Sequence, residues 1–222
     1  MFATNGLFIA LEGIDFTGKT TQREFIAETF RDAGFEVIIT REPGGTPQAE
    51  RIRDLLLTPH QEDLTPIAEV LLFFAAREQH LATLIRPALA RGAVVITDRF
   101  VDSTYAYQAA GGGVSEAWIN DLSEMVVADH QPDMTFLLTM DPEKAKLRAN
   151  ARGALDRMED KADEYYVKAQ QAFIYRALQA KHRYKIVEAG GDIESVRAQI
   201  LSKCNLLIHQ LRKSRAKQKD AS

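Results

Sequence analysis

Cysteine is almost absent from the sequence: Cys204 is the only one in 222 residues. A single thiol excludes an internal disulfide and a zinc site built from cysteines. The leucines and isoleucines around Cys204 fall at helical spacing, so we expect a buried, unreactive thiol. No apolar run approaches the roughly 20 residues of a membrane-spanning helix, and the N-terminal segment lacks the basic stretch of a signal peptide. We therefore expect a cytoplasmic protein that makes no membrane contact.

An excess of positive charge is also missing. The chain has 28 lysines and arginines against 31 acidic residues, which gives a net charge of −3. This balance provides no broad basic field and argues against nucleic acid as a partner. Hydrophobic residues make up 45% of the chain, which is enough for one well-buried core. We expect a single domain over residues 1–211, followed by a flexible basic tail over 212–222.

Short apolar runs alternate with longer stretches of helical periodicity. Each run is too short and too continuously apolar for an amphipathic helix, and such runs are typical of parallel strands buried on both faces. We expect strands at 7–12, 35–40, 93–98, 134–140 and 184–189. We expect helices at about 19–33, 47–57, 64–91, 115–128, 141–151, 160–182 and 192–213. This alternation predicts an α/β fold of three layers with a five-stranded parallel sheet flanked by helices.

The stretch GIDFTGKT, residues 13–20, matches the phosphate-loop pattern G-x-x-x-x-G-K-[ST] at every fixed position. It follows an expected strand and opens an expected helix, which is the context this motif requires. The glycines let backbone N–H groups converge on an oxyanion, and the helix N-terminus adds partial positive charge. Lys19 would reach the β- and γ-phosphates of ATP, and the Thr20 hydroxyl would bind Mg²⁺. The pattern therefore predicts a P-loop NTPase fold.

Two further residues sharpen this reading. Asp98 ends the apolar run AVVITD, and ligands of open α/β sheets bind beyond the carboxyl ends of the strands. We therefore expect Asp98 to hold Mg²⁺ or its water shell. Phe16 is unusually large for a phosphate loop. We expect its φ to stay negative so that the ring points away from the loop, toward the lid or the acceptor pocket.

Three clusters indicate an acceptor that carries its own phosphate. Arg41 stands at the entrance of the Pro-Gly-Gly turn in TREPGGT. Phe73 and Arg77 lie one turn apart on an expected helix and pair a flat surface with a cation. Arg99 follows Asp98 directly and leads into a polar segment that contains Ser103, Thr104, Tyr107 and Gln108. Together these residues outline a site for an aromatic base bearing a phosphate.

The sequence resembles the thymidylate kinase family, the dTMP kinase branch of the nucleoside monophosphate kinases. The resemblance runs from about Leu7 to about Leu211, in family order, and its motifs are LEGIDFTGKTTQ, TREPGGTPQAERIRDLLL, LLFFAAREQH, DRFVDSTYAYQ and RGALDRME. It implies transfer of the γ-phosphoryl group of ATP to dTMP, giving dTDP, with Mg²⁺ as the cofactor. It also implies a homodimer.

The resemblance assigns roles to individual residues. Phe73 would stack on thymine, and Arg77 would bond a base oxygen. The 5′-phosphate of dTMP would be held by Arg41 and Arg99, while Tyr107 would favour deoxyribose. ATP would contact the phosphate loop, namely Gly13, Ile14, Asp15, Phe16, Thr17, Gly18, Lys19, Thr20 and Thr21. Further dTMP contacts would come from Asp15, Glu42, Pro43, Ser103, Thr104 and Gln108.

The family also uses a catalytic arginine, placed either in the phosphate loop or on a lid. Residues 14–17 contain no arginine, so the duty would fall to the lid at about 147–160, as in the bacterial branch. We favour Arg152 as the catalytic cation, with Arg148 and Arg157 as helpers toward ATP. Lys19, Asp15 and Arg99 would complete the catalytic set.

Other functions stay open from the residues alone. A kinase of another nucleoside monophosphate would use the same architecture. A deoxynucleoside kinase would need a carboxylate to activate a sugar hydroxyl, whereas two arginines aimed at an acceptor phosphate favour a monophosphate. A non-catalytic nucleotide switch or scaffold would use the phosphate loop but would not need the arginines and the lid.

Overall fold

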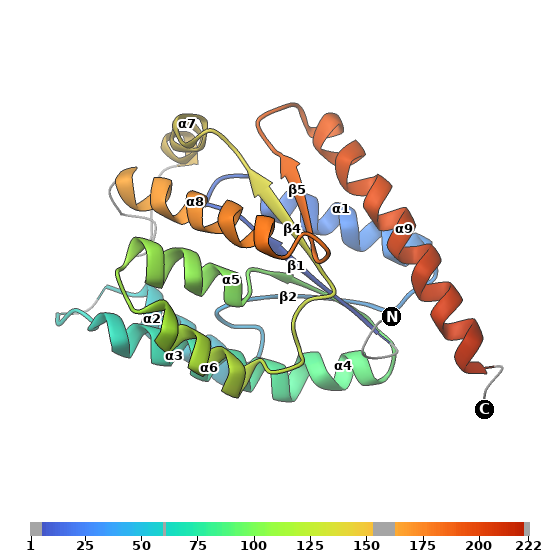
Figure 1. Cartoon of the computed structure of the whole chain (residues 1–222), viewed down its shortest axis with the longest axis horizontal. Coiled ribbons are helices and arrows are strands. Elements are labelled where there is room, and N and C mark those ends of the chain that lie inside the picture. Colours follow the sequence, from blue (N-terminus) through green and yellow to red (C-terminus); the bar gives the residue numbers. More distant parts are fainter. Residues whose placement is uncertain (1–5, 60, 153–162, 220–222) are drawn as a thin grey trace.

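A five-stranded parallel sheet forms the centre of the computed structural model, which describes residues 6–59, 61–152 and 163–219 (Figure 1). The strand order is β2-β3-β1-β4-β5, and every neighbouring pair is parallel. The strands are β1 (Leu7–Glu12), β2 (Val37–Arg41), β3 (Val94–Asp98), β4 (Met134–Thr139) and β5 (Tyr184–Glu188). The predicted α/β fold is confirmed.

The central strand β1 shows why the sheet has helices on both faces. All six of its residues are buried, and successive side chains of a strand point to opposite faces. Leu7, Ile9 and Leu11 belong to one hydrophobic core, whereas Phe8 and Ala10 belong to a second. The sheet therefore separates two cores, and the structure has three layers.

The helices divide between these two cores. The first core is covered by α1 (Lys19–Asp32), α8 (Asp163–Gln179) and α9 (Ile193–Lys219). The second is covered by α3 (Pro66–His80), α4 (Arg86–Ala90) and α6 (Glu116–Val126), as Figure 1 shows. The remaining helices are α2 (Pro47–Leu57), α5 (Val101–Thr104) and α7 (Pro142–Arg152), and two π-helical segments are η1 (Leu81–Ile85) and η2 (Tyr105–Gly111).

Cys204 on α9 is fully buried, as expected, and burial raises the pKa of its thiol to about 12.

Several boundaries differ from those expected. The second strand begins at Val37 rather than at residue 35, because Phe35 packs against Phe30 at the end of α1, with ring centroids 6.1 Å apart. The helix expected over 64–91 is interrupted by the wider turn η1. We did not expect a helix after Asp98, yet α5 and η2 are helical. Their polar residues lack apolar periodicity because most face the site rather than a core.

The C-terminal segment is also different from the expectation. We expected a flexible tail from residue 212, but α9 continues to Lys219. Arg212 donates a hydrogen bond to the carbonyl of Ala33 at 2.8 Å, and Arg215 donates to the carbonyl of Gly92. Both guanidinium groups also lie over the ring of Phe35. These contacts satisfy one carbonyl at the C-cap of α1 and one in the turn that follows α4, and they accompany the extension of α9 beyond its apolar residues.

Within the described ranges, no helix combines the length and the apolar character that crossing a membrane requires. The cytoplasmic location stays a prediction. The division into one domain with a lid also stays a prediction, since the lid expected at 147–160 lies partly outside the described residues.

Candidate active site

The phosphate loop joins β1 to α1 and takes a tightly folded path. Gly13 has a φ of 134° and Gly18 a φ of 90°, conformations that other residues rarely adopt. A β-carbon on Gly13 would also collide with the backbone carbonyl of Leu138 in β4. The Lys19 ammonium lies beneath the loop and donates to the carbonyls of Gly13 at 3.0 Å and Ile14 at 2.8 Å. The loop and its lysine thus have the arrangement that the motif predicts.

Lys19 sits among several charges. Burial and the nearby Arg99 lower the pKa of its ammonium to about 8, although Asp15, Asp98 and Glu12 act in the opposite direction. The side chain therefore keeps most of its charge at neutral pH. Binding of an anion beside it would favour the protonated form further.

Phe16 contradicts our expectation for its backbone. Its φ is 65°, in the left-handed region, rather than negative. For a residue with a side chain this conformation costs roughly 1–2 kcal/mol. The strain lies in the phosphate loop, where the backbone conformation is constrained by the N–H groups that must converge. The carbonyl of Phe16 is 3.5 Å from the guanidinium of Arg148.

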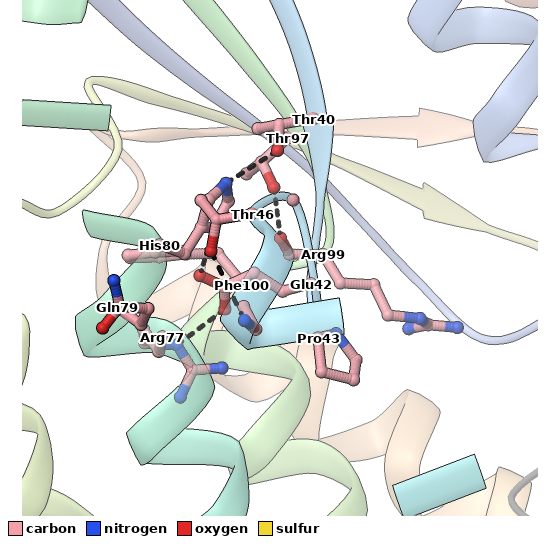
Figure 2. A network of polar contacts seen from close by, with 12 residues as sticks. Thr40, Glu42, Pro43, Thr46, Arg77, Gln79, His80, Thr97, Arg99 and Phe100 are labelled. Atoms are coloured by element: carbon pink, nitrogen blue, oxygen red, sulfur yellow. Dashed lines mark hydrogen bonds and ion pairs between the residues drawn. The ribbon is translucent and has the colours of Figure 1, made fainter. Parts of the chain in front are cut away.

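Arg99 links the phosphate loop to the acceptor segment. It follows β3 with a φ of 67°, and the Thr97 hydroxyl donates to its carbonyl at 2.9 Å (Figure 2). Its guanidinium donates to the Gly13 carbonyl at 3.0 Å and the Ser103 hydroxyl at 3.1 Å, and it pairs with Asp15. The catalytic candidates Lys19, Asp15 and Arg99 therefore meet at one place.

Asp15 stays ionised in this setting. Burial alone would raise the pKa of its carboxyl group, but the charges of Arg99 and Lys19 and hydrogen bonds from Arg99 and Tyr107 lower it below its usual value. The Tyr107 hydroxyl lies 3.3 Å from the Asp15 carboxylate. Burial holds the pKa of Tyr107 well above its usual range, so the phenol is neutral and donates.

Glu12 is a residue of this site that the sequence reading missed. It ends β1, is fully buried, and accepts from the backbone N–H groups of Phe100 at 2.8 Å and Ser103 at 3.2 Å. The Ser103 hydroxyl also donates to it at 2.6 Å. Burial and the charge of Asp102 raise the pKa of Glu12 to about 7 despite these bonds and Arg99. A glutamate inside an otherwise apolar strand, directly before the loop glycine, was the available signal.

A pocket opens beside this cluster, between α2, α3 and the α5–η2 segment. It brings together most residues that the sequence assigned to the acceptor, and adds others that it did not. The lining residues are Asp15, Glu42, Pro43, Arg53, Leu57, Phe73, Arg77, Arg99, Phe100, Ser103, Thr104, Tyr107 and Gln108. The Gln108 amide is held by Glu69 of α3 at 3.0 Å. The pocket thus has an aromatic and an arginine on one wall and the phosphate-loop cluster at its end.

Arg77 is almost completely buried in the pocket wall. Its Nε donates to Glu42 at 2.7 Å, its Nη2 donates to Thr104 at 3.2 Å, and Figure 2 shows how Glu42 lies against it. The guanidinium also lies over the rings of Phe74 and Phe100, 4.9 and 5.4 Å from their centroids. Its third nitrogen, Nη1, is buried and finds no hydrogen-bond partner among the described residues. A buried donor without a partner is rare in folded proteins.

Arg41, which we expected to bind the acceptor phosphate, does not line the pocket. β2 ends at Arg41, and its half-exposed side chain pairs with Glu50 of α2 at 2.9 Å. Arg53 lines the pocket instead and donates to the Pro43 carbonyl at 2.8 Å. The spacing of Arg53 and Leu57, one helical turn apart on α2, was a signal for a shared face.

The expected Mg²⁺ ligands lie near the loop. Thr20 is exposed in the first turn of α1, and Asp98 ends β3 beside β1. Arg23, one turn after Thr20, approaches the Asp98 carboxylate to 3.9 Å, so this carboxylate lies near the beginning of α1. Hydroxyl and carboxylate oxygens suit Mg²⁺, which keeps further ligands from water and phosphates. The described residues contain no cluster of three or more histidine, cysteine or acidic side chains for a metal.

The lid arginines are only partly described. Arg148 on α7 reaches toward the loop, with the Phe16 and Ala189 carbonyls each 3.5 Å from its guanidinium. Arg152 is the last residue of α7, and its side chain lies outside the described part of the structure, as does all of Arg157. The catalytic role of Arg152 therefore stays a prediction.

A parallel sheet with a phosphate loop after its central strand, facing a pocket lined by arginines, defines a P-loop kinase of a small anionic acceptor. The family model described as thymidylate kinase matches residues 11–200. The chain therefore belongs to the thymidylate kinase family.

Individual relatives agree with this assignment. The chain is 50% identical over 207 residues to a thymidylate kinase of Pseudomonas fluorescens, covering 93% of this chain and 99% of the relative. It is 48% identical over 195 residues to one of Hahella chejuensis, covering 88% and 94%. The crystal structure of thymidylate kinase from Ehrlichia chaffeensis superimposes with a TM-score of 0.73 at 32% identity, covering 90% of this chain and 98% of that chain.

Proposed function

We propose that the protein transfers the γ-phosphoryl group of ATP to the phosphate of dTMP, giving ADP and dTDP. The observation that carries this proposal is the buried, unpartnered Nη1 of Arg77, a residue that lines the pocket beside the phosphate loop. A pyrimidine with an oxygen at its edge would accept this hydrogen bond. Phe73, on the same helix, would cover the face of the ring.

The acceptor phosphate would lie at the loop end of the pocket. Arg53 and Arg99 both line that pocket, and guanidinium groups bind phosphate in a bidentate manner. Ser103 and Tyr107 would contact the sugar, with the bulk of the tyrosine ring favouring a deoxyribose. Arg41 is excluded from this role in our proposal, because its side chain is held by Glu50 on the outer side.

The reaction would need little acid–base chemistry from the protein. An oxygen of the dTMP phosphate, already anionic, forms the new bond to the γ-phosphorus, and the bond to the ADP oxygen breaks. Positioning and charge neutralisation supply the catalysis of such transfers. Lys19 would bind the transferred group from the loop side. Arg152 would bring a second cation from the lid.

We infer a site for Mg²⁺ at Thr20 and Asp98. The cation, when bound, would neutralise part of the charge on the donor phosphates. Asp15, which pairs with Arg99, would hold that guanidinium beside the loop during transfer. Substitution of Asp98 by Asn should raise the Mg²⁺ concentration for half-maximal rate, and an unchanged requirement would remove Asp98 from the site.

Steady-state kinetics over a panel of acceptors tests the proposed function. ADP release is measured with dTMP, dUMP, dCMP and thymidine, and Lys19→Met serves as the inactive control. We expect the highest kcat/KM with dTMP and no turnover with thymidine. A preference for dCMP would identify a different monophosphate kinase. Turnover below about one per minute with every acceptor, far under the usual range for kinases, would favour a non-catalytic nucleotide-binding protein.

We also propose a homodimer. Ile67 and Leu71 of α3 and Trp118 and Met125 of α6 are large apolar side chains at least 46% exposed, and these two helices lie side by side (Figure 1). An apolar surface formed by adjacent helices suits a symmetric partner. Gel filtration near the 24.8 kDa monomer mass would contradict the proposal.

A further inference from the structure

Behind the pocket wall, a chain of buried polar groups runs from the sheet to Arg77 (Figure 2). The Thr40 hydroxyl on β2 is 2.7 Å from Nε2 of His80, and Nδ1 of His80 is 3.1 Å from Oε1 of Glu42. Glu42 in turn accepts from Nε of Arg77 at 2.7 Å through its other oxygen. All four side chains are at least 94% buried.

The direction of each hydrogen bond follows from the chemistry of the groups. Arginine nitrogens can only donate, so the Glu42 carboxylate that faces Arg77 accepts. His80 must therefore donate to Glu42 from Nδ1. In the neutral ring, Nε2 then carries no proton and accepts from the Thr40 hydroxyl. Threonine, histidine and glutamate thus form one ordered relay that ends on the guanidinium.

The glycine turn closes over this relay. Gly45 has a φ of 86°, and a β-carbon there would lie 2.6 Å from Nε2 of His80 and closer still to the Thr40 hydroxyl. Only glycine fits at this contact. The turn that carries Glu42 and the ring of His80 therefore hold each other in place, which leaves the Glu42 carboxylate little freedom to rotate.

Arg77 is fixed at two of its three nitrogens, by Glu42 at Nε and by Thr104 at Nη2. A planar guanidinium held at two points has one orientation, so the direction of Nη1 is set by these partners. Loss of either anchor would let the group turn within the slot between Phe74 and Phe100. The orientation of the unpartnered donor therefore depends on how firmly Glu42 is held.

We propose that His80 is a positioning residue for base specificity: through Glu42 it aims Nη1 of Arg77 at an oxygen of the base. The inference rests on the proposed function and deepens it, since it names the residues that discriminate between bases. A thymine oxygen accepts from Nη1. The amino group of cytosine at the equivalent edge is itself a donor, and two donors facing each other leave both unsatisfied.

Replacement of His80 by two different amides separates positioning from simple packing. The amide nitrogen of Asn occupies the place of Nδ1 and retains the bond to Glu42, whereas the amide of Gln extends to the place of Nε2 and contacts Thr40 instead. We expect His80→Gln to raise the KM for dTMP about tenfold and to lower the preference for dTMP over dCMP by a similar factor. The KM for ATP and kcat should change less than about threefold.

The conservative variant and a surface histidine complete the test. His80→Asn should restore the KM for dTMP and the dTMP preference to within about threefold of wild type, since the Glu42 bond persists. His182→Gln makes the same substitution at an exposed position and should change nothing. Thr40→Val, which removes only the hydroxyl, should give an intermediate loss of preference, and it tests the relay even if His80→Gln does not fold.

Two results would overturn the inference. One is equal loss of activity with dTMP and dCMP in His80→Gln or Thr40→Val, which would indicate a packing role. The other is no difference between the Asn and Gln variants. In either case wild type would still prefer dTMP, so the proposed function would stand. A wild-type enzyme without a dTMP preference would overturn both.

Discussion

The phosphate loop takes its shape from consecutive residues, whereas the acceptor pocket is assembled from segments far apart in the chain. In the loop, the backbone N–H groups and the adjacent Lys19 would bind the phosphates. In the pocket, each important side chain is held by another element: Arg77 by Glu42, and Arg99 by Asp15. The contrast teaches that phosphate binding is a local property of this chain, while base and acceptor recognition depends on the complete fold.

The largest loss of activity should follow from a substitution on the ATP side of the site. The phosphate loop would bind phosphate mainly through backbone groups, so most of the positive charge must come from other segments. Arg152→Ala removes the proposed lid cation and should lower kcat about 10³-fold, the scale of catalytic arginines in phosphoryl transfer. The KM values for both nucleotides should change little. Steady-state kinetics checks this, with Arg148→Ala and Arg157→Ala as matched variants of smaller effect. A kcat within threefold of wild type would exclude Arg152 as the main cation.

The second largest effect is expected in the acceptor pocket, where substitutions of Arg53 and Arg41 are compared. Arg53→Ala should raise the KM for dTMP about 10- to 100-fold, the usual value of a charge-assisted hydrogen bond to phosphate. Arg41→Ala should change it less than about threefold, because Arg41 pairs with Glu50 outside the pocket. Both variants are assayed with saturating ATP. A larger increase of the KM for dTMP in Arg41→Ala than in Arg53→Ala would show that Arg41 binds the acceptor phosphate.

Glu12 lies between the phosphate loop and the acceptor segment, and its ionisation should change the free energy of unfolding. The pKa of Glu12 is raised from 4.5 to about 7 in the folded protein. The folded state therefore binds this proton more tightly than the unfolded state, and Glu12 makes unfolding easier as the pH rises from about 4.5 to 7. In this window the group should account for roughly 1–3 kcal/mol of lost stability. Glu12→Gln should flatten that dependence.

Urea unfolding of wild type and Glu12→Gln at several pH values measures the difference. Asp102 serves as an internal contrast, since its pKa is lowered to about 2, chiefly because Arg176 and Arg183 outweigh its burial. The stability that ionised Asp102 contributes rises with pH and is complete above about pH 4. This lies below the range of about pH 4.5 to 7 in which the ionisation of Glu12 acts. Equal pH slopes for the two proteins between 4.5 and 7 would refute the assignment to Glu12.

Substitution of Phe16 should have the smallest effect on activity and stability. Glycine adopts its left-handed backbone without penalty, so Phe16→Gly should gain up to about 1 kcal/mol of stability or lose none. The enzyme should stay active with an altered KM for ATP. Phe16→Ala removes the ring but keeps the strain, and it separates the two causes. An unfolded or inactive glycine variant would mean that the ring maintains the loop.

The strands and the phosphate loop were readable from the sequence because their signals are local: apolar runs of strand length, and glycines at fixed spacing. The misreadings concern side chains whose contacts depend on how separate elements pack together. Arg41 looked like an anion ligand, but β2 ends so that its side chain meets Glu50. His80 carried no signal beyond a helix position, because its role depends on Glu42.

Two further discrepancies have different physical causes. The φ of Phe16 is set by closure of the loop rather than by the preference of the residue. The helical segment 101–111 presents buried polar groups to the site, so apolar periodicity could not reveal it. Arg53 was visible as a helix residue, but only the packing of α2 beside α3 places it in the pocket.

The position of β1 has a consequence for how the chain acquires its function during synthesis. β1 leaves the ribosome well before both of its neighbours, β3 and β4, which follow it by more than 80 residues. Contacts between such distant segments form late in folding. The nascent chain therefore carries a complete phosphate-loop sequence long before it has a sheet to hold it, so ATP binding should begin only after β4 has emerged.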